Sequence, residues 1–409
     1  MAEQLDTVVI GGGQAGLAMS YFLSRQKREH IVLEEHAIGH AWRTRWDSFT
    51  LVSPNWTLNL PGHEYHGDNP DGFLLRDEVV RYVEQYAEQY NVPIRLGVRV
   101  TSVEGALGDS GYLVKTDNGD YTCRNVVVAA GLFQQPKLSP YADKLAPGVL
   151  QLHTSKYRNP SVLPDGGVLV VGSGQSGCQI AQELHESGRQ VHLCVGNAKR
   201  IRRRYRGYDG FWWRNEIGNF DHTVADLDSP KERFAGNPHA SGKNGGTEIN
   251  LHEFARDGIN LLGHLRGIQA SKITLAPDLK KTLASIDAQE EKFCQSVDKL
   301  IRTKDIKAEA PDRSPDPKDG FDVEIVTELD LHEKGITTLI WAAGYSFDFS
   351  WVRFPVFDEY GFPNQQQGVT GQPGLYFLGL HFLHKRKSGL FLGVGEDAEH
   401  VAGHIAARS

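Results

Sequence analysis

The chain contains few cysteines, and no two of them have the spacing of a redox or metal-binding motif. Its 409 residues include only Cys123, Cys178, Cys194 and Cys294, and no CxxC sequence is present. This scatter excludes the local CxxC dithiol of a disulfide reductase and a zinc site built on paired cysteines. It is typical of a protein kept in a reducing compartment, so we expect a cytoplasmic location and no bound metal.

Long apolar segments and an excess of positive charge are also lacking. The longest apolar stretch near the C-terminus is interrupted by the charged residues 384–387, which makes it a poor membrane span. The first residues, MAEQLD, lack the basic and apolar regions of a signal peptide. The formal net charge of −7 disfavours a nucleic-acid-binding surface. We therefore expect a globular protein that acts on small molecules, without a membrane span.

The sequence does contain one glycine pattern in two copies. The GxGxxG spacing occurs at Gly11, Gly13 and Gly16 and again at Gly172, Gly174 and Gly177. Each copy follows an apolar run typical of a buried strand and opens a stretch typical of a helix. In a Rossmann unit such glycines let the backbone approach a pyrophosphate at the N-terminus of the helix. Two copies in this context predict two dinucleotide sites on one α/β chain, most simply for hydride transfer between the two dinucleotides.

The order of the predicted elements indicates two nested Rossmann-like domains. Residues 6–11, 14–26 and 30–35 read as the first strand, helix and second strand of the opening unit. The last third of the chain contains another strand that ends in AAG and then a segment resembling the closing part of that unit. We therefore predict a first domain from residues 1–165 and 336–409, with a second domain, residues 166–335, inserted into it. The final helix is expected to begin near Glu396.

The first glycine turn is predicted to bind FAD. Glu34 lies at the end of the second predicted strand, where an acid accepts hydrogen bonds from a ribose. The turn is close to the N-terminus and is followed by Gly39-x-x-Trp42-Arg43, which favours FAD over NAD. The alternative is a tight turn with a surface glutamate. The predicted cofactor contacts of this domain are Gly11, Gly13, Gln14, Ala15, Gly16, Glu34, Trp42, Arg43, Val100, Gly131, Gly344, Glu396 and Asp397.

The second glycine turn is predicted to bind NADPH. Its second strand ends at Val195-Gly196 without an acid, and a basic run follows at 199–206. A carboxylate at the strand end would repel a 2′-phosphate, whereas basic side chains hold one. Not all of these cations can reach one phosphate, and the alternative is a solvated basic surface. The predicted contacts are Gly172, Gly174, Gln175, Ser176 and Gly177, with Arg200 and Arg202 as the first candidates for the phosphate.

Three further positions have both a catalytic and a structural interpretation. Asn55 could hydrogen-bond an oxygenated flavin, or it could simply form a turn. His153, with Tyr157 four residues later, could position the cofactors between the two domains, or it could be a surface-loop histidine. Glu396 and Asp397 could place a helix N-terminus at the flavin ring, or they could only cap that helix.

Cys178 is predicted to be a packing residue, and the aromatic residues 211–213 to be core or pocket lining.

Several segments together resemble the class B flavoprotein monooxygenases. They are GHAWRTRWDSFTL, PNWTLNLPG, VVVAAGLFQQP, HTSKYR, the second glycine turn and IWAAGY. The group includes flavin-containing monooxygenases, plant YUCCA-type enzymes and Baeyer–Villiger monooxygenases. The resemblance implies that NADPH reduces FAD, that O₂ forms a flavin C4a-hydroperoxide, and that this oxygenates a small organic substrate. It further implies that Asn55 and His153 tune or shield the flavin, and it makes a homodimer plausible.

The linker between the domains departs from the family pattern. The family signature is roughly F-x-G-x-x-x-H-x-x-x-[FYW], whereas here Ala146 replaces the aromatic residue and one extra residue separates Gly148 from His153. The Tyr157 ending resembles the flavin-containing type more than the tryptophan of Baeyer–Villiger enzymes. N- or S-oxygenation is therefore the expected reaction. The alternatives are Baeyer–Villiger or decarboxylative oxygenation, an NAD(P)H oxidase or flavin reductase without oxygenated product, and a non-catalytic redox sensor.

Overall fold

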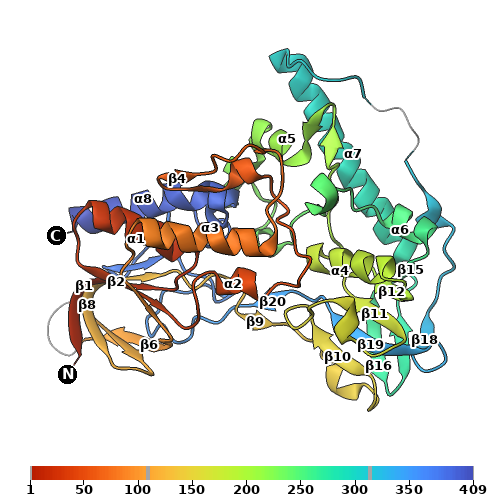
Figure 1. Cartoon of the computed structure of the whole chain (residues 1–409), viewed down its shortest axis with the longest axis horizontal. Coiled ribbons are helices and arrows are strands. Elements are labelled where there is room, and N and C mark those ends of the chain that lie inside the picture. The colour runs from red at the N-terminus through yellow and green to blue at the C-terminus, as the bar shows by residue number, and fades with distance from the viewer. Residues whose placement is uncertain (1, 107–110, 312–315, 409) are drawn as a thin grey trace.

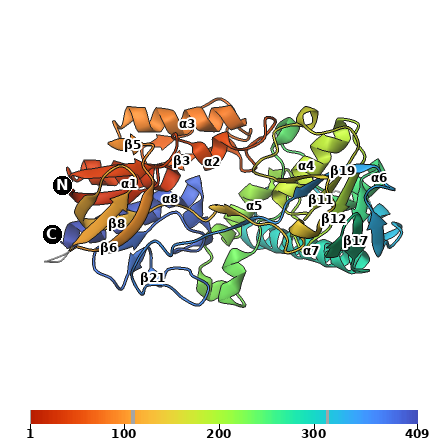
Figure 2. The same cartoon turned by 90° about the horizontal axis from the view of Figure 1, so that it is seen from below.

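Two lobes, each built around a largely parallel sheet, make up the α/β fold seen in the computed structural model of the chain (Figure 1). The structure describes residues 2–106, 111–311 and 316–408. Both termini lie in the first lobe, and the middle of the chain forms the second (Figures 1 and 2). The predicted α/β class with two dinucleotide-binding folds is thereby confirmed.

The sheet of the first lobe has the strand order β21-β22-β23-β8-β1-β2-β5. Its central strands are parallel, and the C-terminal ends of β1 and β8 are apolar and buried, as expected for strands covered on both faces. A meander of β6 and β7 extends from β8. The bounds are β1 Glu3–Ile10, β2 His30–Glu34, β5 Ile94–Leu96, β6 Val100–Gly105, β7 Tyr112–Thr116, β8 Tyr121–Val128, β21 Gln365–Gln366, β22 Val369–Thr370 and β23 Leu375–Phe377.

Helices α1 and α8 pack against each other in the first lobe, and α3 lies beside them (Figure 1). The helix bounds are α1 Gln14–Arg25, α2 His40–Arg43, α3 Arg76–Gln89 and α8 Phe391–Ala407. The prediction that the last helix begins near Glu396 is wrong, because α8 already begins at Phe391. Gly393 and Gly395 disfavour a helix locally, but the burial of Phe391 and Val394 in the core outweighs that preference.

The sheet of the second lobe is fully parallel, in the order β10-β19-β11-β12-β15. A small antiparallel sheet of β16, β17 and β18 follows it. The strands are β10 Leu150–His153, β11 Gly167–Val171, β12 Val191–Cys194, β15 Asn260–Leu262, β16 Leu265–Gln269, β17 Lys272–Leu275, β18 Glu328–Asp330 and β19 Ile336–Trp341. The helices are α4 Gln175–Glu186, α5 Gly210–Glu216, α6 Leu251–Asp257 and α7 Leu279–Lys304.

The sheets do not follow the domain boundaries predicted at 165/166 and 335/336. Strands β10 and β19, which the prediction placed in the first domain, pair with each other and with β11 in the second sheet. Strands β9 and β20 pair with each other between the two lobes, where the chain passes from one lobe to the other (Figure 1). The remaining short strands are β3 Asn59–Leu60, β4 His63–Glu64, β9 Gln135–Pro136, β13 Arg204–Tyr205, β14 Tyr208–Asp209 and β20 Tyr345–Ser346. None of the helices in the described residues is long and apolar enough to cross a membrane.

Candidate functional site

The first glycine turn connects β1 to α1 and leaves an open space at the start of the helix. Gly11 has a φ of 111°, and a Cβ there would lie 2.6 Å from the carbonyl oxygen of Ala129. At Gly16 a Cβ would lie 1.9 Å from the Gly11 oxygen. A Cβ added at Gly13, in contrast, would meet no atom of other parts of the chain within 4 Å, and no side chain caps α1. The first N–H groups of α1 are therefore free to receive a phosphate.

Glu34 lies beside this turn, at the end of β2. One carboxylate oxygen accepts a 2.7 Å hydrogen bond from the Gly12 N–H, and the other accepts a 2.9 Å bond from the His36 N–H. The carboxylate thus occupies the position at which a Rossmann unit binds ribose. Its role as a ribose ligand stays a prediction that this geometry supports.

The second glycine turn, between β11 and α4, has the same geometry. Gly172 has a φ of 108°, and a Cβ there would lie 2.7 Å from the Ala342 oxygen. At Gly177 a Cβ would lie 2.0 Å from the Gly172 oxygen, whereas Gly174 faces open space and α4 has no side-chain cap. The two turns are therefore structural copies of each other, one in each lobe.

A segment of the second lobe packs against this second turn. The Gln175 side chain accepts a 3.0 Å hydrogen bond from the Ala240 N–H and donates one to the Ala240 carbonyl. The His239 ring donates to the carbonyl of Ser173, and its own pKa is lowered to about 4 by burial. Gln175, predicted as a cofactor contact, thus has its side chain held by the protein itself.

Arg200 and Arg202 form an internal ion-pair network. Arg200, only 4% exposed, pairs with Glu248 at 2.9 Å and with Glu290 at 2.7 Å. Arg202 pairs with the other oxygen of Glu290 at 2.8 Å and with Asp316. Burial raises the pKa of Glu290 against the pull of the two arginines. Neither arginine forms a solvated surface, and their role in binding the 2′-phosphate stays a prediction, in competition with these carboxylates.

Asn55 is buried and uses both polar groups of its side chain on neighbouring backbone. Its Nδ2 donates a 3.0 Å hydrogen bond to the Asn69 carbonyl, and its Oδ1 accepts a 2.9 Å bond from the Leu74 N–H. The side chain therefore fixes the loop 69–74. These contacts favour the structural interpretation over contact with an oxygenated flavin.

His153 lies at the junction of the two lobes, at the end of β10. Its Nε2 is 3.0 Å from the Gly344 carbonyl, and its ring meets that of Tyr345 edge-on at 4.9 Å. Burial is the main cause that lowers the pKa of His153, and the charge of Arg45 acts in the same direction. Because His153 is only 5% exposed, the surface-loop alternative is wrong. Tyr157 is fully buried and donates to Glu183 on α4 at 2.9 Å.

The sequence analysis missed Arg45, in the same GHAWRTRW segment as Trp42 and Arg43. Arg43 pairs with Glu84 near the surface. Arg45, in contrast, has a buried Nε without a hydrogen-bond partner, and its guanidinium lies 5.8 Å from the centre of the Phe49 ring. No ion pair of Arg45 is found in the described part of the chain. The signal was present as a second arginine in the motif, but sequence alone does not show which of the two is buried.

The remaining predicted residues are spread over both lobes. Trp42 stacks on Phe391, the first residue of α8, at 5.7 Å. Glu396 pairs with Lys385 and Lys387, and Asp397 is buried with a raised pKa, mainly because of that burial. Both acids follow the first turn of α8, so the prediction that they form its N-terminus is wrong. Ala15 and Ser176 lie in the first turns of α1 and α4, and the others lie next to strands: Val100 at the start of β6, Gly131 after β8 and Gly344 after β19.

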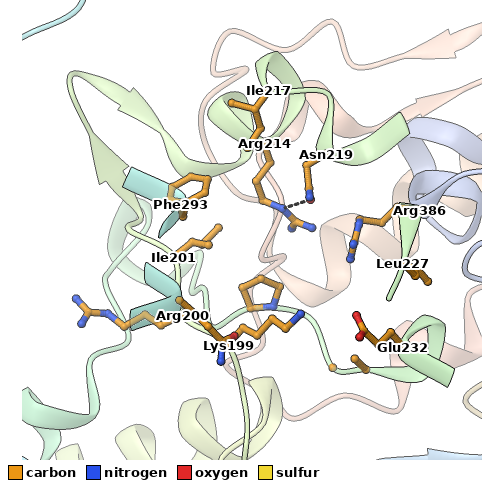
Figure 3. Close-up of a pocket in the computed structure, with 14 residues that line it drawn as sticks. Lys199, Arg200, Ile201, Arg214, Ile217, Asn219, Leu227, Glu232, Phe293 and Arg386 are labelled. Atoms are coloured by element: carbon orange, nitrogen blue, oxygen red, sulfur yellow. Dashed lines mark hydrogen bonds between the residues drawn. The ribbon is translucent and has the colours of Figure 1, made fainter. Parts of the chain in front are cut away.

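A cavity of about 150 Å³ opens between the segment that follows β12, helices α5 and α7, and the segment before α8 (Figure 3). Arg214 and Arg386 line it from different elements. The aromatic residues 211–213 do not line it: Trp213 is fully buried, and Trp212 stacks on Tyr208 at 4.1 Å. The core interpretation of these aromatics is thereby favoured. Cys178 is fully buried with a raised pKa, as expected of a packing residue.

Comparison with known proteins gives matches along the whole chain. Residues 8–208 match the family model described as pyridine nucleotide-disulphide oxidoreductase. The chain is 36% identical over 408 residues, 99% of each protein, to an uncharacterized CzcO-like oxidoreductase of Geobacillus kaustophilus. It is 28% identical over 198 residues, 47% of each protein, to a probable indole-3-pyruvate monooxygenase, YUCCA4, of Arabidopsis thaliana.

The fold is also found in solved structures. A flavin-containing monooxygenase from Stenotrophomonas maltophilia superposes with a TM-score of 0.67 at 20% identity, covering 99% of each chain. The protein OTEMO, solved as a complex with FAD and NADP, superposes with a TM-score of 0.58 at 16% identity, covering 100% of this chain and 86% of that one. At these identities the likeness concerns the arrangement of the two lobes.

Proposed function

Because the chain belongs to the family of CzcO-like oxidoreductases, within the class B flavin-monooxygenase-like proteins, we propose that it is an NADPH- and FAD-dependent monooxygenase of a small organic molecule. One observation carries this proposal. The two glycine turns have the same backbone geometry, each at an uncapped helix N-terminus, and they lie in two separate parallel sheets. Two such sites on one chain are suited to electron transfer between two dinucleotides.

The first lobe has the features of an FAD site. Gly13 offers the open space that a pyrophosphate needs, and a Cβ at Gly11 or Gly16 would collide with backbone atoms. Glu34 is placed to accept hydrogen bonds from the ribose. When bound, FAD supplies the redox chemistry, accepting electrons from NADPH and passing them to O₂. We assign the further predicted contacts at Gln14, Ala15, Trp42 and Gly131 to the same site.

The second lobe has the features of the NADPH site. Gly174 again faces open space at the start of α4, with Ser176 in the first turn of the helix. We propose that the basic run after β12 selects NADPH over NADH by its charge, with Arg200 and Arg202 able to contribute only if a phosphate displaces part of their carboxylate contacts. His153 then stands between the lobes as a neutral hydrogen-bonding group.

N- or S-oxygenation of the substrate is the favoured reaction, and it follows from the resemblance of the linker to the flavin-containing type. The protein's own tasks are to bind both dinucleotides, to orient them and to exclude water, since water in the site favours release of H₂O₂ over oxygenation of the substrate. A cytoplasmic location and a homodimer stay predictions from the sequence.

Rapid mixing tests the proposal directly. The FAD-loaded protein is reduced anaerobically with NADPH and then mixed with O₂ while the flavin spectrum and H₂O₂ are followed. A monooxygenase should form a transient spectral species that is neither oxidised nor reduced flavin, and candidate amines and sulfides should gain one atom of ¹⁸O from ¹⁸O₂. Stoichiometric H₂O₂ with every candidate substrate, and no such species, would favour an oxidase or reductase.

A Gly174→Ala variant tests the second site, and chemical reduction of the same variant is its control. Its added methyl group points into the open space at α4, so reduction by NADPH should become at least about tenfold slower, which corresponds to ~1.4 kcal/mol. Chemical reduction with dithionite bypasses that site and should proceed as in the unmodified protein.

A further inference from the structure

Two of the arginines that line the cavity of about 150 Å³, Arg214 and Arg386, have no carboxylate partner among the described residues (Figure 3). Arg214 projects into it from α5, and Arg386 projects from the 3₁₀ helix Arg386–Gly389 before α8. Lys199 also lines the cavity, whereas the guanidinium of Arg200 is turned away toward its own ion pairs. Glu232 is the acid among the lining residues, and it is exposed.

Arg214 is a buried cation held only by neutral groups. Its Nε donates a 3.0 Å hydrogen bond to Asn219, and its guanidinium lies 4.7 Å from the centre of the Phe220 ring and 5.5 Å from that of Phe211. Burial, helped by the like charge of Arg386, lowers the pKa of Arg214 to about 9, so the side chain is still charged at neutral pH. No ion pair compensates this charge in the described residues.

Arg386 is the second uncompensated cation. Its Nε is buried without a hydrogen-bond partner, and its guanidinium lies 4.8 Å from the centre of the Phe382 ring. Glu232 attracts it at longer range but forms no ion pair with it. Two arginines of like charge therefore face one cavity, and neither forms an ion pair with the described residues.

Two other buried arginines near the cavity, Arg200 and Arg203, are paired. Arg203 contacts Asp209 at 2.6 Å, and Arg200 contacts two glutamates. This contrast indicates that the missing counter-charge at Arg214 and Arg386 comes from outside the chain, because buried charges are stable when they are paired.

The cavity also lies next to segments that belong to both cofactor-binding lobes. Arg386 precedes Gly389, whose carbonyl accepts a hydrogen bond from Gln14 at the first glycine turn. Lys199 follows β12 of the second lobe, and Gln289 and Phe293 of α7 close the other side. A cavity of about this volume holds a group the size of benzene.

We propose that this cavity binds the carboxylate of a small acidic substrate, with Arg214 and Arg386 as its counter-ions. The assignment of the bound acid as the substrate rests on the proposed monooxygenase function, whereas anion binding itself does not. Guanidinium groups suit a carboxylate because they offer parallel N–H donors, and both arginines present theirs to the same space.

Calorimetric titration of the FAD-loaded protein with two isosteric pairs tests the proposal without turnover. The pairs are benzoate with benzamide and phenylacetate with phenylacetamide. At least one acid should bind about tenfold or more tighter than its amide, a difference of ~1.4 kcal/mol. Arg386→Gln should abolish this preference, and Arg386→Lys should retain part of it. Arg204→Gln, at an exposed arginine outside the cavity, should leave the preference unchanged.

The variants are made at Arg386 and not at Arg214, because replacing the buried Arg214 could prevent folding. Circular dichroism and FAD content confirm that each variant is folded. Equal affinity for acid and amide, or no binding of either acid, would overturn the proposal. So would an Arg386→Gln variant that keeps its acid preference. If that variant instead raises the KM for NADPH but not for NADH, the anion is the cofactor phosphate and the substrate assignment fails. If the protein binds the acid but forms no oxygenated product, the proposed function is refuted, whereas the proposed anion site is still supported.

Discussion

The side chain of Gln14 donates a 2.8 Å hydrogen bond to the carbonyl of Gly389, 375 residues further along the chain. The bond joins the first residue of α1 to the last residue of the 3₁₀ helix that carries Arg386. The first glycine turn is therefore hydrogen-bonded directly to one wall of the arginine-lined cavity. We expect a substitution at the turn to shift the position of that wall, and the reverse.

Substitutions at Gly11 and Gly13 should separate folding from FAD binding. Gly11→Ala places a methyl group against the Ala129 carbonyl in a left-handed conformation, and we expect a loss of ~1–3 kcal/mol of stability. Gly13→Ala meets no atom within 4 Å, so the apoprotein should keep its stability while FAD affinity falls. Thermal unfolding of the apoproteins and FAD titration measure the two effects. Unchanged FAD affinity in Gly13→Ala would place the pyrophosphate elsewhere.

Arg200→Gln should destabilise the protein more than it affects the choice of nicotinamide cofactor. The substitution removes one of the two arginines that compensate the buried Glu290, and breaking a buried pair costs ~3–5 kcal/mol. The double variant Arg200→Gln/Glu290→Gln should lose less than the sum of the single losses, as measured by urea unfolding. A raised KM for NADPH alone, at unchanged stability, would instead support direct contact with the 2′-phosphate.

His192 should make the protein less stable in acid. Both of its ring nitrogens are buried without a partner, and burial, helped by Lys334, lowers its pKa from 6.5 to about 4. Between these two values the unfolded chain binds a proton that the folded chain does not, so stability falls as the pH falls. At pH 5 the loss should be about 2 kcal/mol from this group.

His192→Leu should therefore flatten the pH dependence without harming the fold at neutral pH, because it removes two unpaired polar atoms. Urea unfolding at pH 7.5 and at pH 5 measures both effects. The same acid loss in the variant as in the unmodified protein would show that His192 is not the group responsible.

Asn55→Asp should test whether this residue is structural or catalytic. The new carboxylate oxygen would face the Asn69 carbonyl that now accepts a hydrogen bond, and we expect a loss of ~1–3 kcal/mol. Activity per bound FAD should change little if the residue only fixes the loop 69–74. A higher yield of H₂O₂ at unchanged thermal stability would reveal a catalytic role.

The parts of the fold that depend on short-range sequence patterns could be predicted from the sequence. Both glycine turns and the β1-α1-β2 unit follow patterns contained within about thirty residues, and the structure contains each of them. The membership of β10 and β19 in the second sheet depends on pairing between residues near 150 and near 340, which no local pattern records.

The site was harder to predict because its chemistry depends on which charges are paired. Arg200 and Arg202 looked available in a basic run, yet glutamates at 248 and 290 neutralise them in the fold. Arg45 and Arg386, which lack such partners, were not singled out by any spacing. The start of α8 was misplaced for a related reason, since tertiary packing of Phe391 outweighs the glycines nearby.

The nesting of the two lobes also has a consequence during protein synthesis. By the time residue 341 has left the ribosome, all five strands of the second sheet exist and can pair. The first sheet must wait for the last part of the chain, because Val126–Val128 pair on one side with Leu375–Phe377. Until then the nascent chain presents an apolar strand edge, which is prone to non-native association. The edge is therefore closed only once residues 375–377 have been translated and can pair.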